Sequence, residues 1–280
     1  MIEFRNVTFT HPEGRAPVFT DLSLSLPDGI ISCIGQNGTG KSTLLLLAGG
    51  RLLPDQGTVL IDGRDTRSFL SEEARAEYAA FIYQNMEFET EDRVGELLSY
   101  VLEHGFLARK DRTLIDELVA EFELDHCLGA SLSRVSKGEL QRTILAFSLL
   151  YGSRHLLMDE PVFALEDAQK TRTLAYITGR VRKNGGGWLY SLHELELSRT
   201  YSDYLLIFSK NAPPRLGPTG DLYRRDIIEE AYEAPLDALK RRESLFRDVL
   251  IRLDKVHRER LTREASGADG AGGNGTGRGL

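Results

Sequence analysis

Short apolar runs and helix-spaced apolar stripes alternate along most of the chain. The predicted buried strands are apolar runs at residues 30–34, 79–83, 156–158, 188–192 and 204–208. A looser alternation of apolar and polar positions predicts further strands at residues 2–9, 18–26 and 58–63. Strands that alternate with helices are typical of an α/β fold with a mainly parallel sheet and helices on both faces. The early strands predict an antiparallel β subdomain beside it.

The spacing of apolar residues becomes helical between the second and third of the buried runs. Val94, Leu98 and Leu102 form one stripe, and Leu114 and Leu118 begin another. We therefore expect a helical subdomain at about 85–150, inserted into a domain that spans residues 1–220. Helical spacing returns in a highly charged segment, 221–265, which predicts a C-terminal helical extension. Residues 266–280 are rich in glycine and predict a disordered tail.

The strongest chemical signal is a glycine-rich loop between a predicted strand and a predicted helix. Its pattern, G-x-x-x-x-G-K-[ST], is that of a P-loop, whose backbone N–H groups and following helix hold a polyphosphate. Lys41 is expected to reach the β- and γ-phosphates, and the Ser42 hydroxyl to bind Mg²⁺. The residues predicted to form the cradle are Gly35, Asn37, Gly38, Thr39, Gly40, Lys41, Ser42 and Thr43.

A second signal is a pair of carboxylates at the end of the run 156–158. Asp159 has the position of a Walker B residue, which holds Mg²⁺, and Glu160 can act as the general base for the attacking water. The alternative is a charged pair that caps the strand before Pro161. The complete P-loop upstream favours the catalytic interpretation.

These motifs, with four others in the same order, resemble the ATP-binding subunit of an ABC transporter over residues 1 to about 210. Gln84 matches the family's glutamine at the end of a strand, and His193 matches its switch histidine. The signature motif aligns with Val135-Ser136-Lys137-Gly138-Glu139 and the following Leu140-Gln141-Arg142, and the dimer-contact loop aligns with Phe163-Ala164-Leu165-Glu166.

The resemblance implies an ATPase that needs Mg²⁺ and works as a head-to-tail dimer with a second ABC ATPase subunit, expected to be an identical chain. Ser136 and Gly138 would bind the γ-phosphate of an ATP held by the partner's P-loop. His193 would contact that phosphate and hold Glu160 and the water in line. Gln84 would bind Mg²⁺ or the water and sense an integral-membrane permease.

Four positions depart from the family's pattern. Lys137 replaces a glycine of the signature, Glu139 replaces its glutamine, and Glu166 replaces an aspartate in the dimer-contact loop. His11 takes the place of the aromatic residue that stacks on adenine. A glutamate near a phosphate needs to face away from it or to pair with Lys137 or Arg142. None of these changes removes the lysine, the carboxylates or the histidine, so we expect hydrolysis.

Composition and charge limit the compartments and partners that we expect for this protein. The net charge of −7 argues against a general nucleic-acid surface. The two cysteines, Cys33 and Cys127, offer neither a disulfide framework nor a metal-binding spacing, which fits a reducing cytoplasm. The longest apolar run, 44–48, is too short to cross a bilayer, so no membrane insertion is expected. These features predict a cytoplasmic protein, peripheral on the cytoplasmic face of the cell membrane.

Two alternatives remain for the cellular role. The segment from Gly220 to Pro235 resembles the C-terminal end of ATPases that serve importers of iron–siderophore, haem and cobalamin, whereas Lys137 resembles some exporter signatures. The glutamate at position 139 also resembles soluble ABC ATPases that act in iron–sulfur assembly or on DNA. Coupling to a permease is favoured because the helical subdomain and Gln84 are the features on which a membrane partner would dock.

Overall fold

The computed structural model of this protein describes residues 1–84, 86, 88–210, 212–241 and 243. It divides the chain into two compact units, Met1–Ala234 and the residues from Pro235 onward. The stripe expected beyond Leu239 and the tail 266–280 lie outside the described residues, apart from positions 240, 241 and 243. Of the helices in the described residues, none combines the length and the apolar character that crossing a bilayer requires.

A six-stranded sheet forms the centre of the first unit, in the order β10-β9-β3-β8-β7-β6. The strands from β9 to β6 pair in parallel, and β10 is antiparallel to β9. The bounds are β3 Gly29–Gly35, β6 Ala79–Ile82, β7 His155–Asp159, β8 Gly187–Ser191, β9 Tyr204–Ser209 and β10 Ala212–Pro218. Because β3 lies between β8 and β9, the glycine loop that follows it leaves from the middle of the sheet. The sequence analysis missed β10.

The apolar strands are buried on both faces, as their composition predicts. Successive residues alternate between two cores: Trp188 and Tyr190 face one, and Leu189 faces the other. The first core also holds the helices α3 Val94–His104, α4 Thr113–Glu121, α5 Lys137–Tyr151 and α6 Asp167–Asn184. The second core lies between the central sheet, α1 Lys41–Ala48 and an antiparallel sheet.

The antiparallel sheet has the order β2-β1-β4-β5 and confirms the predicted β subdomain. Its strands are β1 Ile2–Phe9, β2 Phe19–Leu26, β4 Gln56–Ile61 and β5 Arg64–Asp65, and the chain returns to the central sheet through α2 Glu72–Tyr78. Ser71 caps α2 by accepting a hydrogen bond from the backbone N–H of Ala74. This fold agrees with the predicted α/β class.

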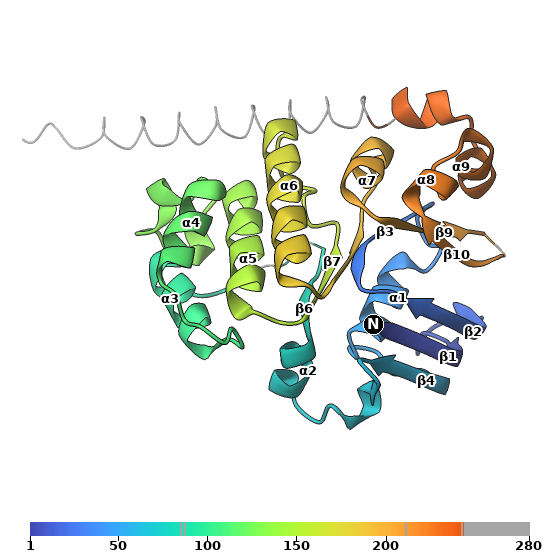
Figure 1. The fold of residues 1–280 in the computed structure, drawn as a ribbon, viewed down its shortest axis with the longest axis horizontal. Coiled ribbons are helices and arrows are strands. Elements are labelled where there is room, and N and C mark those ends of the chain that lie inside the picture. The colour runs from blue at the N-terminus through green and yellow to red at the C-terminus, as the bar shows by residue number, and fades with distance from the viewer. Residues whose placement is uncertain (85, 87, 211, 242, 244–280) are drawn as a thin grey trace, which may run out of the picture. The chain divides into compact units, whose positions relative to one another are not determined.

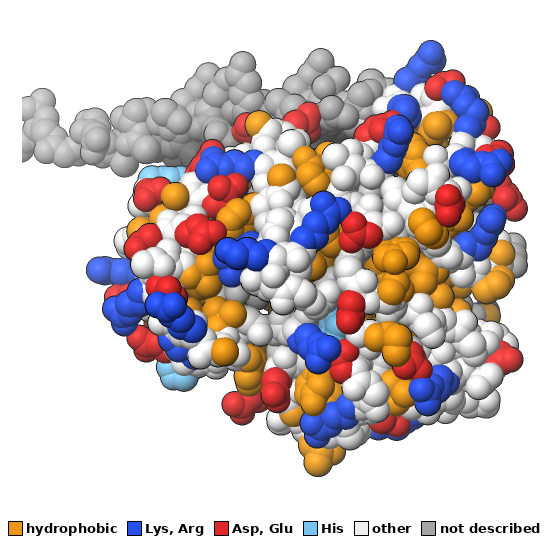
Figure 2. Space-filling model, viewed as in Figure 1, with side chains coloured by type: hydrophobic (Ala, Val, Ile, Leu, Met, Phe, Trp, Pro, Cys, Tyr) orange, Lys and Arg blue, Asp and Glu red, His pale blue; other side chains and the backbone are white. Residues whose placement is uncertain are grey.

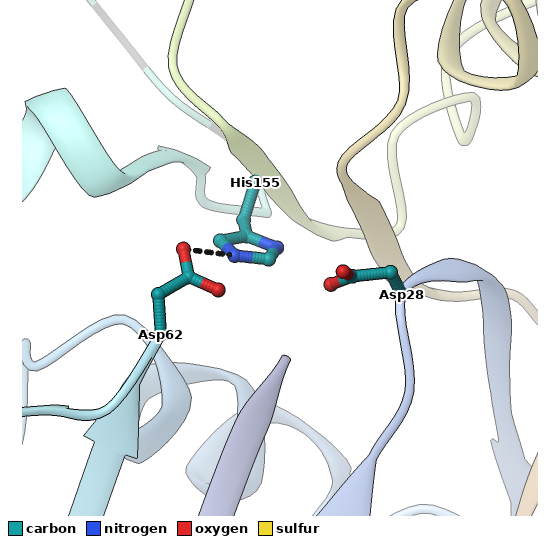
Figure 3. Close-up of side chains that lie close together, drawn as sticks. All are labelled: Asp28, Asp62 and His155. Atoms are coloured by element: carbon teal, nitrogen blue, oxygen red, sulfur yellow. Dashed lines mark hydrogen bonds and ion pairs between the residues drawn. The ribbon is translucent and has the colours of Figure 1, made fainter.

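A polar cluster joins the two sheets at the edge where β7 begins (Figure 3). The buried His155 lies 3.0 Å from Asp62, which follows β4, and Asp28 precedes β3. The α-ammonium group of Met1 bridges the carboxylates of Asp28 and Asp62 at 2.5 and 2.7 Å, and Arg154 contacts Asp62 at 3.1 Å. With the Met1 ammonium and the Arg154 guanidinium against it, Asp62 is the centre of a structural ion-pair cluster.

The helical subdomain, α3 to α5, lies beside α6 at the end of the central sheet that carries β6 (Figure 1). Basic and acidic side chains are interleaved over this face of the molecule (Figure 2). Among the exposed ion pairs of the described residues, Arg172 of α6 contacts Glu121 at 3.0 Å and Glu123 at 3.2 Å. Such exposed pairs add little stability, but they leave the described part of this face without a continuous stripe of one charge.

Helix α7 Leu195–Tyr201 connects β8 to β9, and the first unit ends in two short helices after β10, α8 Thr219–Leu222 and α9 Arg225–Tyr232. The segment from residue 221 is therefore not one continuous helix. Arg224 is extended (ψ 146°) and separates α8 from α9. Glu233 adopts a left-handed conformation (φ 51°) and ends α9 just before Pro235. This ending places the last residues of α9 close to the glycine loop.

Candidate nucleotide site

The glycine loop has the backbone that its sequence predicts. Gly35 has φ 142°, and a Cβ there would lie 2.3 Å from the carbonyl oxygen of Phe208 on the neighbouring strand. Gly40 has φ 101°, and a Cβ there would lie 2.9 Å from the Phe19 ring. Only glycine fits both positions. The loop therefore passes directly from β3 into α1, and the amino end of α1 faces the concave side of the loop. A phosphate cradle requires this arrangement.

Lys41 is held inside this loop. Its side-chain ammonium donates hydrogen bonds to the carbonyl oxygens of Gly35 and Gln36, both at 2.8 Å. Only 7% of Lys41 is exposed, and this burial lowers its pKa, while nearby Cys33, Glu160 and Asp159 oppose the shift. A cation in contact with backbone carbonyls and close to carboxylates is poised to bind a polyphosphate.

The carboxylate pair leaves β7 beside the end of β8, where Asp159 pairs with Ser191. The Ser191 hydroxyl donates to Asp159 Oδ1 at 2.6 Å and accepts the backbone N–H of Glu160 at 2.9 Å. Glu160 has φ 52°, a left-handed conformation that is uncommon for a non-glycine residue. Such strain is found at functional sites. Here it turns the Glu160 side chain away from the line of the strand.

Three predicted site residues meet at Glu160. His193 Nε2 lies 2.6 Å from Glu160 Oε1, and Gln84 Nε2 donates to Glu160 Oε2 at 2.8 Å. Gln84 follows β6, Glu160 follows β7 and His193 follows β8, so the carboxyl ends of three strands that lie side by side assemble this cluster. These two contacts fix the direction of both oxygens of the Glu160 carboxylate. Gln84 is exposed, so it can change its hydrogen-bond partner.

The donors fit Mg²⁺ and a nucleotide phosphate. Ser42 and Gln84 are exposed, and Asp159 has a carboxylate beside the loop, so oxygen ligands of the kind that Mg²⁺ prefers are available. Gly38 has φ 76° and no atom within 4 Å of an added Cβ, so the mouth of the loop is open. His11 lies beside it, with Nε2 3.0 Å from Thr43 Oγ1 and its ring edge-on to Phe9.

The signature segment forms the amino end of α5. Ser136 is the N-cap of the helix: its hydroxyl accepts the backbone N–H of Glu139 at 3.3 Å, and its own N–H donates to the Glu139 carboxylate at 2.7 Å. This is a capping box, and it uses the glutamate that departs from the family's pattern. Lys137 between them is exposed.

Glu139 has a further partner that the sequence analysis did not identify. His126, in the 3₁₀ turn Asp125–Cys127, lies 2.5 Å from the Glu139 carboxylate. Burial opposes ionisation of Glu139, but the hydrogen bonds from His126 and Ser136 outweigh it and lower its pKa. The two partners suggested for Glu139, Lys137 and Arg142, are replaced by His126, and Arg142 lies 3.7 Å from Glu123.

Within one chain the two segments predicted to bind phosphate, the P-loop and the signature segment, lie apart. Figure 1 shows α5 in the helical subdomain, separated from α1 by α6 and the strands between them. Gly138 faces the dimer-contact loop, since a Cβ there would lie 3.4 Å from the Ala164 carbonyl oxygen. Gln141 of α5 donates to the Pro161 carbonyl oxygen at 2.8 Å, so the signature helix contacts the chain just after Glu160.

Sequence analysis also missed Ser191, which joins Asp159 to Glu160. The available signal was its position at the end of a strand, two residues before His193. No local pattern identifies His126 as the partner of Glu139, because their contact depends on the packing of the helical subdomain.

Comparison with known proteins identifies the family in which these motifs occur. The family described as ABC transporter matches residues 19–163. The hemin import ATP-binding protein HmuV of Pseudomonas entomophila is 32% identical over 204 residues, which cover 69% of this chain and 78% of that protein. The petrobactin import ATP-binding protein YclP of Bacillus subtilis is 25% identical over 237 residues, covering 83% and 93%. The fold resembles a dimeric ATP-binding cassette in a post-hydrolysis state with ADP and phosphate (TM-score 0.68, 21% identity, 78% of this chain and 99% of that one).

Proposed function

The chain belongs to the ABC transporter family as an ATP-binding and ATP-hydrolysing subunit, and from this premise we propose how its site works and what it serves. Two copies bind head to tail, each P-loop facing the signature segment of the other copy. Two ATP molecules lie between them. The dimer drives an integral-membrane permease from the cytoplasmic face of the membrane.

The observation that carries this proposal is the separation of two complementary half-sites in one chain. The P-loop holds Lys41 inside a cradle, while Ser136 presents an exposed helix amino end on another part of the molecule. A helix amino end attracts anions, and a phosphate bound to one P-loop leaves its outer oxygens open to a second surface. A head-to-tail pair joins the two half-sites twice with the same contact.

Each residue around the phosphate has one proposed task. Lys41 binds the β- and γ-phosphates, helped by the loop Gly35, Asn37–Gly40 and Thr43, and His11 lies against the adenine. Ser42, Asp159 and Gln84 would hold Mg²⁺, which neutralises phosphate charge when bound. Ser191 keeps Asp159 in place through its 2.6 Å hydrogen bond.

Hydrolysis uses the cluster at Glu160. Its carboxylate accepts a proton from the water that attacks the γ-phosphate, and the hydrogen bonds from His193 and Gln84 aim it. Since Gln84 is exposed and bonded to the base, a movement of the permease that pulls Gln84 away would change the direction of the carboxylate. This links hydrolysis to the state of the membrane partner.

The proposed cargo class rests on the names of relatives. Two of them are import ATP-binding proteins for petrobactin and for hemin, and the similarity covers 83% and 69% of this chain. We propose that the permease is an importer of the iron–siderophore, haem or cobalamin type. Purification of the chain from detergent-solubilised membranes, followed by mass spectrometry, should recover an integral-membrane permease. Recovery from the soluble fraction alone would contradict the coupling.

The dimer is tested by cross-linking. Asn37→Cys on the P-loop and Lys137→Cys in the signature place two exposed thiols on the half-sites of one chain, and the natural Cys33 and Cys127 are buried. With Glu160→Gln to slow hydrolysis, a short bis-maleimide should give covalent dimers that require ATP. The matched control pairs Asn37→Cys with Lys183→Cys, at the opposite edge of the sheet. Equal yields for both pairs would contradict the head-to-tail arrangement.

A further inference from the structure

The end of α9 contacts the entrance of the P-loop. The hydroxyl of Tyr232 accepts a hydrogen bond from the backbone N–H of Gly35 at 2.9 Å, although 197 residues separate the two. Gly35 is buried and Tyr232 is partly buried, so this hydrogen bond is shielded from water. The contact is a feature of the fold, because the P-loop motif says nothing about Tyr232.

A second contact lies next to the first. The Gln36 amide donates to the Glu233 carboxylate at 3.3 Å and approaches the Ala231 carbonyl oxygen at 3.5 Å. Lys210, which follows β9, donates to the same carboxylate at 2.8 Å. The left-handed conformation of Glu233 (φ 51°) ends α9 at this point. Three consecutive residues, Ala231 to Glu233, therefore contact both residues that open the loop.

Those two loop residues also hold the catalytic lysine. The carbonyl oxygens of Gly35 and Gln36 accept the hydrogen bonds of Lys41 at 2.8 Å each. Gln36 also accepts the Thr39 hydroxyl at 2.8 Å. Any rotation of the backbone at Gly35 or Gln36 would move the carbonyls that position Lys41. Glycine at position 35 has little intrinsic resistance to such rotation, so the restraint has to come from neighbouring groups.

We propose that Tyr232 is a positioning residue for nucleotide binding: by holding the Gly35 amide, and with help from Glu233 on Gln36, it keeps the P-loop in the shape that receives ATP. This inference rests on the proposed role of the P-loop in holding ATP. It also gives a task to the segment after the sheet.

The expected consequence is specific to binding. Tyr232→Phe keeps the ring and removes only the hydroxyl, which leaves a buried N–H at Gly35 without its partner. The loop then spends less time in the shape that binds ATP, and the apparent dissociation constant rises by the inverse of that fraction. The turnover number should change little, because Glu160 and His193 are held by Gln84, Ser191 and each other rather than by α9.

The test compares Tyr232→Phe with Tyr223→Phe in the full chain. Tyr223 lies just after α8, and its hydroxyl contacts Glu196 at 3.1 Å. We expect Tyr232→Phe to raise the Kd for a fluorescent ATP analogue, and the KM for ATP, by about three- to tenfold with kcat within about twofold, the size of one lost hydrogen bond. Tyr223→Phe should match the wild type. Glu233→Gln should give a smaller rise in Kd of the same kind.

The outcomes separate this inference from the proposed function. If the wild type binds the analogue and Tyr232→Phe binds it equally well, the positioning role is wrong. A fall in kcat and in melting temperature at unchanged KM would show a merely structural contact and would also overturn it. If the wild type itself fails to bind, or Lys41→Ala binds as the wild type does, the assigned nucleotide site is wrong whatever Tyr232 does.

Discussion

The two segments proposed to bind phosphate, the P-loop and the signature segment, are built in opposite ways. The P-loop is restrained from outside: the Phe208 carbonyl leaves no room for a side chain at Gly35, and Tyr232 and Glu233 hold its first residues. The signature segment is restrained from inside, by a capping box between Ser136 and Glu139 within one helical turn. The P-loop is thus fixed by the sheet around it. The signature segment is an exposed helix end fixed by hydrogen bonds within its own first turn.

This difference shows where each half-site can vary. A side chain at Gly35 or Gly40 would clash with neighbouring groups, and one at Gly38 would have to adopt a strained φ of 76°; this chain keeps the full P-loop pattern. A helix end needs only a residue at its third position that reaches back to the cap, and Glu139 satisfies that need as glutamine would. The altered signature therefore remains a well-formed helix start, and the carboxylate of Glu139 lies 2.5 Å from His126 Nε2.

The largest expected effect comes from a change at Glu160, the proposed general base. Glu160→Gln should lower the rate of ATP hydrolysis by about 10²- to 10⁴-fold, because the amide cannot accept a proton, with ATP binding kept. Phosphate release measures the rate, and a fluorescent ATP analogue measures binding. Glu117→Gln, which removes a carboxylate bonded to Tyr176 at 2.6 Å, is the control. An unchanged rate in Glu160→Gln would disprove the general-base role.

The next comparison separates the half-sites directly. Lys41→Ala should weaken ATP binding to the single chain by about ten- to a hundredfold, since hydrogen bonds from a charged donor are lost. Ser136→Ala should leave that binding unchanged and lower hydrolysis by about tenfold, since its partner phosphate belongs to the other copy. Ser71→Ala removes the same kind of cap from α2, away from the site, and should leave hydrolysis unchanged. Weakened binding by a monomeric Ser136→Ala chain would contradict the two-copy site.

The smallest effect concerns stability at the edge of the central sheet where β7 begins, opposite the P-loop. Burial lowers the pKa of His155 below its ordinary 6.5, despite Asp62. Burial opposes the ionisation of Asp62, but hydrogen bonds from the Met1 ammonium and His155 outweigh it and lower its pKa below 3.8. Both side chains bind protons more readily in the unfolded chain than in the folded protein. The free energy of unfolding should therefore fall as the pH drops below about 6.5, and fall again below about 4.

His155→Asn should therefore flatten the dependence of melting temperature on pH between about 6.5 and 5, whatever its effect on the absolute melting temperature. The exposed His104 provides the control, and His104→Asn should keep the wild-type profile. An unchanged slope in His155→Asn would assign the acid sensitivity to another group.

Prediction from the sequence worked best where a local pattern has only one structural solution. The P-loop follows from its glycines, the strands follow from apolar runs, and the approach of Gln84, Glu160 and His193 follows from three parallel strands that end at one edge. It failed where chain direction changes without a strong signal. The hairpin to β10 was missed.

The candidate chemistry of this protein could be predicted from its sequence, because the P-loop, the carboxylate pair and the helix cap are short-range patterns whose backbone geometry depends on neighbouring residues. Tertiary structure alone decided which distant groups support that chemistry. Ser191 behind Asp159, His126 beside Glu139 and Tyr232 on Gly35 each depend on contacts between segments far apart in the chain. Such contacts leave no local periodicity, since their partners are chosen by the packing of sheet and helices rather than by spacing along the sequence.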